Sequence, residues 1–189
     1  MKTLQKTLLA LAAGTLMTAG AQAAVTYGNG MTAQPYIGAK VGQYDLDGAK
    51  DKGTSYGVYG GAKFTPNFGL EAEYLTTSDE DLNDVQEYSA DTYGVYATGD
   101  YAFPNTGGLY GKGRLGIAKN EVDVKGKGIA SGLKTSGSET GVAGGLGLGF
   151  NVAPNASIEA MYNWYPSIET NVGEDLDASG VTLGAHLKF

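Results

Sequence analysis

Cysteine is absent from the 189 residues, and histidine occurs only once, at His186. Without cysteine the fold contains no disulfide, and no thiolate can serve as a nucleophile or a metal ligand. A histidine that acts as a general base needs a partner beside it, and no serine or second histidine joins His186 in a recognisable motif. The sequence therefore predicts no catalytic residue, no metal site and no cofactor.

Long hydrophobic runs are also absent beyond the N-terminal segment, since no later stretch approaches the roughly 20 apolar residues of a transmembrane helix. The N-terminal segment has the features of a secretory signal peptide. Lys2 and Lys6 form a basic region, and Leu8–Met17 is an apolar stretch too short to span a bilayer. The small residues of Ala21–Ala23 predict cleavage before Ala24. We expect a signal peptide at residues 1–23 and one domain at residues 24–189; the alternative is an uncleaved anchor or a buried helix.

Positive charge is scarce as well. The formal charge is −7, and it becomes −9 once Lys2 and Lys6 are removed with the signal peptide. This acidity argues against nucleic acid as a partner. The abundant residues are instead glycine, with 31 copies against a usual share of about 7%, and tyrosine, with 13. Such a composition favours tightly packed β structure with aromatic residues at interfaces.

Apolar and polar residues alternate with a period of two through the mature sequence, which predicts β-strands. In the last segment, for example, Val181 and Leu183 alternate with Thr182 and Gly184. The expected strands span residues 36–44, 55–64, 69–75, 91–103, 109–119, 140–152, 157–165 and 179–189.

The connections between these segments alternate in length. Three are short and contain Pro-Asn, at Pro66-Asn67, Pro104-Asn105 and Pro154-Asn155, where proline presets a turn and ends the strand. The other four are longer, polar and rich in glycine, at residues 45–54, 76–90, 120–139 and 166–178. Short turns at one end and long loops at the other are typical of an outer-membrane barrel with both termini on the periplasmic side.

Internal repeats support a chain of hairpins. "SYGVYGGAKF" from Ser55 recurs as "TYGVYATGDY" from Thr92, and "PNFGLEAEY" from Pro66 recurs as "PNASIEAMY" from Pro154. The first pair are strands of one direction, and the second pair are each a turn with a strand of the other direction. The sequence therefore predicts an antiparallel up-and-down meander.

A soluble sandwich or barrel also alternates, with its charged face in water. Three features favour a membrane barrel instead: the export signal, aromatic residues near the strand ends, and the alternating apolar residues that lead to Phe189. The aromatic residues near the strand ends are Tyr56, Phe64, Tyr74, Tyr93, Tyr101, Tyr162 and Trp164. A sheet that spans hydrocarbon must close, because every backbone polar group needs an internal partner.

The chain resembles the small outer-membrane β-barrel family, which includes the OmpA transmembrane domain, OmpX and opacity-type surface proteins. The resemblance rests on "PYIGAKVGQYD" from Pro35, "YGVYGGAKFTPNFGLEAEY" from Tyr56, "PNASIEAMY" from Pro154 and the terminal "VTLGAHLKF". It implies an all-β, eight-stranded antiparallel transmembrane barrel in the outer membrane. The sequence departs from the longer OmpA-type members in that it stops at Phe189, so we expect no peptidoglycan-binding domain. The resemblance also implies a C-terminal signal for the barrel assembly machinery, formed by Val181, Leu183, Ala185, Leu187 and Phe189.

If the apolar faces contact lipid, the charged side chains point into the lumen. An eight-stranded barrel is just wide enough for side chains to fill it, so we expect a buried ion-pair network that closes the lumen. Small residues at Gly141, Gly145, Gly147 and Gly149 are expected to leave room for long basic side chains. The alternative is a gated path for ions or solutes. The expected network comprises Lys40, Lys63, Glu71, Glu73, Asp100, Lys112, Arg114, Glu159, His186 and Lys188.

Two loops carry charge clusters. The loop after the third strand is acidic, with Asp79, Glu80, Asp81, Asp84 and Glu87, and its spacing does not fit an EF-hand. The loop after the fifth strand is basic, with Lys119, Lys125, Lys127 and Lys134. Solvated loops are the simplest interpretation; divalent cations, lipopolysaccharide or a host surface are alternative partners. We therefore expect a structural or surface-interaction protein, with a narrow channel and a membrane enzyme built on His186 as the alternatives.

Overall fold

A computed structural model describes the backbone of residues 25–26, 32–46, 53–78, 80–83, 86–126, 134–169 and 175–189. Side chains are described within residues 33–45, 53–78, 89–123, 137–167 and 177–189. The expected signal peptide lies outside these ranges. So do the side chains of the acidic loop cluster and those of Lys125, Lys127 and Lys134.

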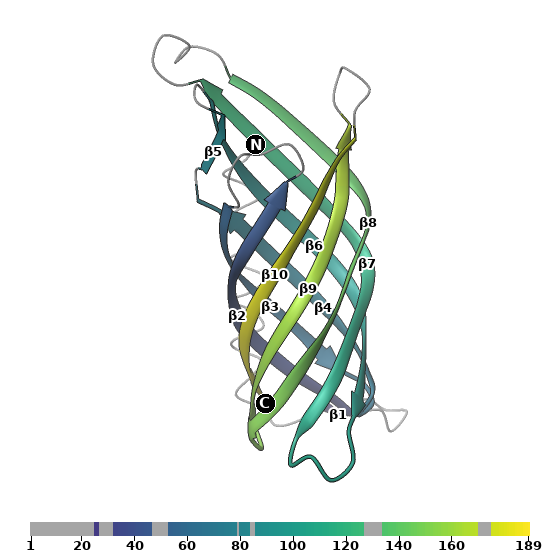
Figure 1. The fold of residues 1–189 in the computed structure, drawn as a ribbon. Coiled ribbons are helices and arrows are strands. Elements are labelled where there is room, and N and C mark those ends of the chain that lie inside the picture. Colours follow the sequence, from purple (N-terminus) through teal and green to yellow (C-terminus); the bar gives the residue numbers. More distant parts are fainter. Residues whose placement is uncertain are drawn as a thin grey trace.

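Eight long strands form one antiparallel barrel, with two short strands beside them (Figure 1). Each long strand pairs with the next along the chain, and β2 pairs with both β3 and β10, which closes the sheet. Lys40, for example, lies opposite Gly57 on one side and Gly184 on the other. The long strands are β2 (Thr32–Leu46), β3 (Gly53–Lys63), β4 (Phe68–Thr77), β6 (Gln86–Ala102), β7 (Leu109–Gly126), β8 (Lys134–Ala153), β9 (Ala156–Glu169) and β10 (Asp175–Lys188); the short ones are β1 (Val25–Thr26) and β5 (Glu80–Asn83). The expected eight-stranded up-and-down barrel is confirmed.

Within the described ranges, no helix has the length and apolar character needed to cross a bilayer. The strands themselves are long enough, because a tilted strand of about 9–11 residues spans the hydrocarbon. The shortest long strand, β4, has 10 residues and the longest, β8, has 20.

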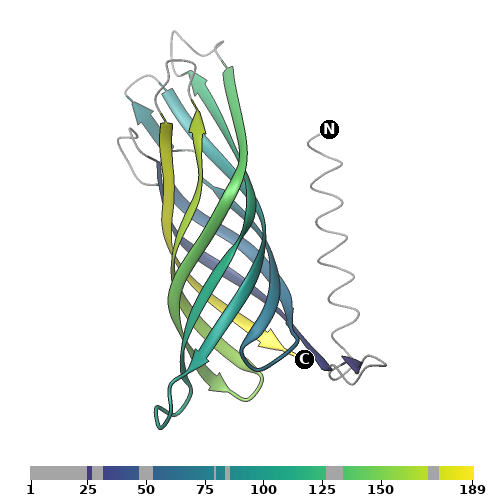
Figure 2. The ribbon, with the colours of Figure 1, turned by 90° about the vertical axis from the view of Figure 1, so that its right-hand side faces the viewer.

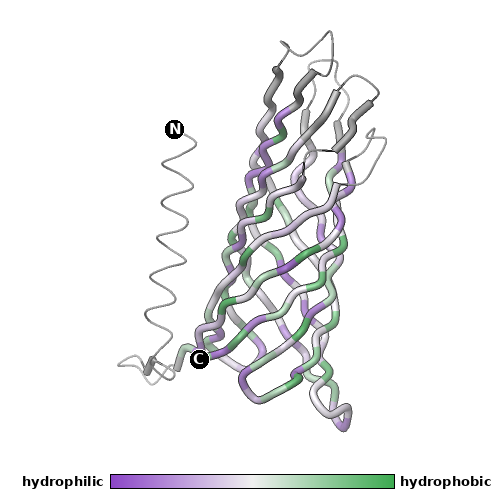
Figure 3. The backbone as a smooth tube through the Cα atoms, turned by 90° about the vertical axis from the view of Figure 1, so that its left-hand side faces the viewer, coloured by the Kyte–Doolittle hydropathy of each residue, from purple (hydrophilic) through white to green (hydrophobic). Residues whose placement is uncertain are grey.

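The outer wall of the barrel is apolar. Alternate residues project outward, and large aliphatic side chains on neighbouring strands are exposed, with Val142 66% and Ile117 63% accessible. Figure 3 shows hydrophobic positions alternating with hydrophilic ones along the strands. In water, such an apolar surface would have to be covered by a partner protein. In a bilayer, the acyl chains of the lipids cover it. The expected outward faces are therefore present on all eight strands.

The three Pro-Asn turns and the C-terminus lie at the same end of the barrel, which we call the turn end (Figure 2). The turn between β6 and β7 contains Asn105 with φ 62° and Gly107 with φ 71°. Asparagine and glycine tolerate this left-handed region better than other residues, so the sequence suits the turn. The far end, where the four longer connections lie, is called the loop end.

The strands continue further at the loop end than the sequence led us to expect. We predicted loops at residues 120–139 and 76–90, but β7 and β8 remain paired as far as Lys125 and Lys134, and β5 pairs with β6. The prediction was wrong because polar character was interpreted as loop. Val122 and Val124 alternate with Glu121, Asp123 and Lys125, which is a strand pattern suited to water rather than to lipid.

Candidate functional site in the barrel lumen

The centre of the lumen is an ion-paired cluster that links opposite walls of the barrel. Glu71 and Glu73 project from β4, and Arg114 from β7. Arg114 Nη1 lies 2.7 Å from Glu73 Oε2, and its Nη2 lies 3.0 Å from Glu73 Oε1, which is a two-point contact. The same Nη1 lies 3.0 Å from Glu71 Oε1. Charge-assisted pairs of this geometry are among the strongest hydrogen bonds in proteins.

Further partners complete the coordination of Glu73. Lys40 Nζ from β2 donates to Glu73 Oε2 at 2.5 Å, and the hydroxyl of Tyr96 from β6 donates to Glu73 Oε1 at 2.9 Å. The guanidinium carbon of Arg114 lies 4.2 Å from the centre of the Tyr96 ring. Tyr96 thus contacts both members of the central ion pair.

Lys112 extends the cluster toward the turn end. Its Nζ lies 2.7 Å from Glu71 Oε2 and 3.1 Å from Glu159 Oε2, so it bridges two carboxylates from opposite sides of the barrel. Glu159 also accepts a hydrogen bond of 2.7 Å from the Tyr110 hydroxyl. His186 Nδ1 lies 3.6 Å from Glu159 Oε1. The chain of contacts therefore runs without interruption from Lys40 to His186.

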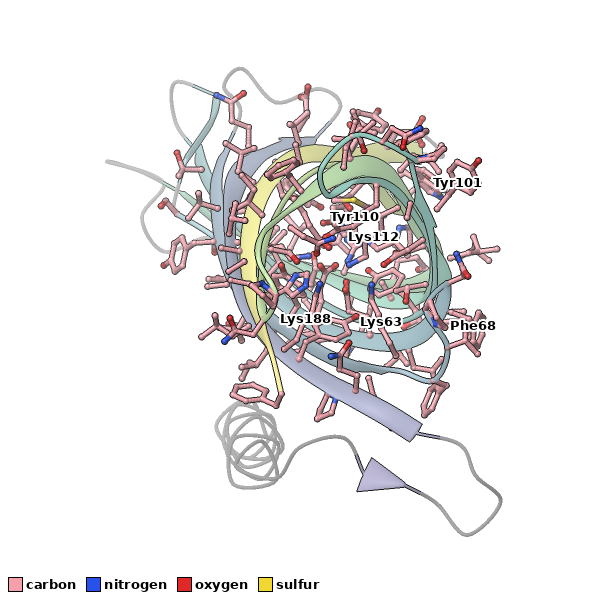
Figure 4. The ribbon with its side chains drawn as sticks, turned by 90° about the horizontal axis from the view of Figure 1, so that it is seen from below. Lys63, Phe68, Tyr101, Tyr110, Lys112 and Lys188 are labelled. Carbon is pink, nitrogen blue, oxygen red and sulfur yellow. The ribbon has the colours of Figure 1, made fainter. Side chains whose placement is uncertain are left out.

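The remaining predicted residues lie apart from this cluster, near the turn end. Lys63 and Asp100 form an ion pair with each other. Lys188 Nζ donates to the side-chain oxygen of Asn151 at 2.6 Å, and within the described ranges it has no carboxylate at ion-pair distance. In the view from below, Lys63, Lys112, Lys188 and Tyr110 point into the lumen, whereas Phe68 and Tyr101 point away from the barrel (Figure 4).

The central cluster is balanced in charge. It contains three cations, Lys40, Lys112 and Arg114, and three carboxylates, Glu71, Glu73 and Glu159, all of them buried. Removal of a single charge from water costs several kcal/mol per ion. Pairing offsets this cost only when every member has its partner, so the six groups depend on one another.

A second, apolar layer fills the lumen on the loop-end side of the ion pairs. It packs the rings of Tyr44 and Tyr165, whose centres lie 5.8 Å apart, against small and aliphatic side chains from the other strands. The layer consists of Tyr44, Leu75, Ala90, Tyr96, Ala118, Val122, Ala143, Tyr165 and Ala178. The lumen is therefore closed at two successive levels by different kinds of packing.

The sequence predicted interfacial positions for five tyrosines near the strand ends, none of which is buried, and six other tyrosines of the described residues point inward. Tyr36 donates to Glu71 Oε2 at 3.0 Å, and Tyr59 lies 3.2 Å from His186 Nδ1. The signal was present in the spacing, because each inward tyrosine lies an even number of residues from an inward polar residue of its own strand. The inward tyrosines are Tyr36, Tyr44, Tyr59, Tyr96, Tyr110 and Tyr165.

The glycines of β8 leave space on one wall, as expected, but mostly for different side chains. Gly149 faces the ring of Tyr110, Gly147 faces Met161, and Gly141 faces Pro166. Only Gly145 lies beside a long basic side chain, that of Arg114. A Cβ at Gly149 or Gly147 would collide with its neighbour, so these glycines allow close packing across the lumen.

The surroundings of His186 do not form a catalytic triad. Its Nδ1 lies near Tyr59 and Glu159, while the hydroxyl of the neighbouring Ser157 donates to Asn151 at 2.7 Å. Among the side chains that are described, no group of three or more His, Asp and Glu residues is arranged to hold a metal ion. The chemistry of the site is that of a packed ionic plug.

Comparison with known proteins agrees with this architecture. Neisserial surface protein A is 15% identical with a TM-score of 0.63, and the match covers 83% of this chain and 97% of that one. Ail of Yersinia pestis is 23% identical with a TM-score of 0.57, over 83% and 97%. The N-terminal barrel domain of Pseudomonas aeruginosa OprF is 17% identical with a TM-score of 0.56, over 82% and 97%.

These solved structures share the fold of this chain, and a comparison with curated proteins gives no match. Residues 8–189 match the family described as outer membrane protein beta-barrel domain. The closed antiparallel barrel, the apolar outer wall and the sealed polar lumen agree with that match. The chain belongs to the outer membrane protein beta-barrel family and resides in the outer membrane.

Proposed function

We propose that this protein is a non-conducting barrel of the outer membrane that displays extended β-hairpins outside the cell for contact with other molecules. The observation that carries the proposal is the double closure of the lumen, by the ion-paired cluster and by the apolar layer of Tyr44 and its neighbours. A lumen packed in this way provides structure rather than passage. The part of the molecule left to interact is then the loop end.

The strands at the loop end support this role. β7 and β8 remain paired from Leu109 to Lys125, well beyond the exposed aliphatic residues of the outer wall. A paired hairpin holds its outer residues in fixed positions, which lowers the entropy cost of binding relative to a flexible loop. The runner-up function is a narrow channel for ions or small solutes, and the two proposals differ in a direct measurement.

The purified barrel is expected to give no stable single-channel steps in a planar lipid bilayer, because the ion-paired cluster and the apolar layer both lie across the lumen. An open porin serves as the positive control, and buffer with detergent alone as the negative control. Stable steps that vanish in a Lys112→Gln, Arg114→Gln double variant would show that ions pass through the cluster, and the channel would become the assigned function.

Adherence tests the display role. Asp123 lies opposite Ser136, so replacement of residues 124–135 by Asn-Gly closes the β7–β8 hairpin with a two-residue turn in the same register. Cells that carry this variant are expected to adhere to epithelial monolayers at least several-fold less than cells with the full-length chain. Equal adherence at equal surface expression would contradict the display role of this hairpin.

Four further assignments belong to the same proposal. Residues 1–23 act as a signal peptide, and N-terminal sequencing of the exported chain is expected to begin at Ala24. The alternating apolar residues from Val181 to Phe189, most of them exposed on β10, are read by the barrel assembly machinery. The outer wall contacts membrane lipid and lipopolysaccharide, and the protein performs no catalysis; His186→Ala is expected to change its stability only.

A further inference from the structure

The wall of the barrel is split at the loop end between β8 and β9. Pairing of these strands starts beside the Pro154-Asn155 turn and stops at Gly144 opposite Trp164. β8 continues for ten more residues to Lys134, and in the described part of the chain β7 is the only strand that pairs with them. The upper ends of β8 and β9 diverge in Figures 1 and 2.

Side chains at the base of the split explain why the two strands separate. The indole of Trp164 occupies the space directly over Gly144. Two residues further, Pro166 of β9 has no N–H to donate, and its ring lies over Gly141 of β8. The β9 side is therefore a poor hydrogen-bonding edge, while the β8 side keeps an edge without proline from Lys134 to Ala143.

The split encloses a cleft of about 600 Å³ with acidic walls. Glu139 stands on the β8 side and Asp177 on the β10 side, where Ser167 donates to its carboxylate at 2.7 Å. Among the described residues that line it, none is lysine or arginine. These residues are Glu139, Thr140, Gly141, Val142, Tyr162, Trp164, Tyr165, Pro166, Ser167, Asp177, Ala178 and Ser179.

An unpaired strand edge presents alternating N–H and C=O groups, which accept a further strand. Natural proteins protect such edges with lysine, proline or an inward charge. The described part of the β8 edge in this cleft, residues 137–143, carries neither lysine nor proline. The charged side chains described at the cleft, Glu139 and Asp177, are both negative. An incoming strand with basic side chains would satisfy the edge and neutralise the carboxylates together.

We propose that this cleft binds an extended, basic peptide segment of a partner protein as an additional strand on the edge of β8. The inference rests on the proposed surface-interaction function, since the cleft opens at the end of the barrel that faces outward. Backbone hydrogen bonds to residues 137–143 provide affinity, and Glu139 and Asp177 select lysine or arginine. A second copy of this chain fits less well, because its own β8 edge is flanked by the same negative charges.

The test uses the full mature chain in lipid nanodiscs and a random twelve-residue peptide library. Bound peptides are expected to be enriched in lysine and arginine and depleted in proline relative to the input. The Glu139→Lys, Asp177→Lys double variant is expected to bind the selected peptides at least ten-fold more weakly, whereas the matched variant Glu121→Lys, outside the cleft, binds them normally. The absence of basic enrichment, or equal binding by the double variant, would overturn the proposal.

A second measurement separates strand addition from simple charge attraction. Each selected peptide is made in two forms, N-methylated at odd or at even positions. Because one edge of an added strand faces β8, one form is expected to lose binding and the other to keep it. Equal effects of both forms would refute strand pairing.

The same preparation is examined for dimers by light scattering. A dimer that disappears in the Glu139→Lys, Asp177→Lys variant would assign the edge to a second copy and overturn the peptide partner. If the peptide tests fail while the shortened β7–β8 hairpin still shows the expected loss of adherence, the cleft proposal is rejected and the display role stands. Equal adherence of the shortened-hairpin variant, together with the expected loss of peptide binding in the Glu139→Lys, Asp177→Lys variant, would reject the display role and leave the cleft proposal standing.

Discussion

Replacement of Arg114 by methionine is expected to lower the free energy of unfolding by about 3–5 kcal/mol, because it leaves Glu71 and Glu73 buried with too few partners. The methionine retains much of the arginine's volume, so the effect reports charge rather than a cavity. The measurement is reversible unfolding by urea in lipid vesicles, followed through the fluorescence of Trp164.

Two controls isolate the cause. Lys119→Met breaks an exposed pair with Glu121 on the outer wall and is expected to cost at most about 1 kcal/mol. A double variant with Arg114→Met and Glu71→Gln leaves two cations and two carboxylates, paired as Lys40–Glu73 and Lys112–Glu159, and is expected to regain part of the loss. If Arg114→Met cost no more than Lys119→Met, the central cluster would not hold the barrel together.

The second large effect concerns the outer wall. Leu115 is exposed midway along β7 between Leu109 and Lys119, and Leu115→Arg is expected to destabilise the barrel in a bilayer by about 2–4 kcal/mol. The cost arises because a cation at mid-depth of the hydrocarbon loses its hydration. Unfolding in vesicles by urea provides the value.

Gln43→Arg is the matched control. Gln43 is also exposed and points outward, but it lies nearer the loop end of β2, where a cation is expected to cost about 1 kcal/mol or less. A depth-dependent difference between the two variants identifies the apolar wall as a lipid contact. A barrel that carried Leu115→Arg without loss would have water, not acyl chains, around it.

The sequence was sufficient for the strands, their order and the direction of most side chains. Period-two alternation assigns Lys112 and Arg114 to the inside and Leu115 and Ile117 to the outside, and both assignments agree with their burial. Proline marks all three short turns. These features are local, so a pattern within a few residues is enough to predict them.

The pairings inside the lumen depend on longer-range geometry. Whether Lys112 meets Glu71, Glu159 or Asp100 depends on the tilt and stagger of strands on opposite walls, which no local pattern encodes. Lys188 accordingly contacts an asparagine where an acidic partner was anticipated. The sequence did not predict the apolar layer, because its alanines are too small to indicate a core on their own. Only closure of the barrel brings Ala90, Ala118, Ala143 and Ala178 beside Tyr44 and Tyr165.

The two levels of lumen packing respond to different stresses. Acid that protonates the carboxylates weakens the attraction among Lys40, Lys112 and Arg114 and their partners, but leaves the contact between the Tyr44 and Tyr165 rings intact. Agents that loosen hydrophobic contacts act on the rings and spare the charges. Under the proposed non-conducting role, either level alone is therefore expected to keep the lumen closed when only one of these stresses acts.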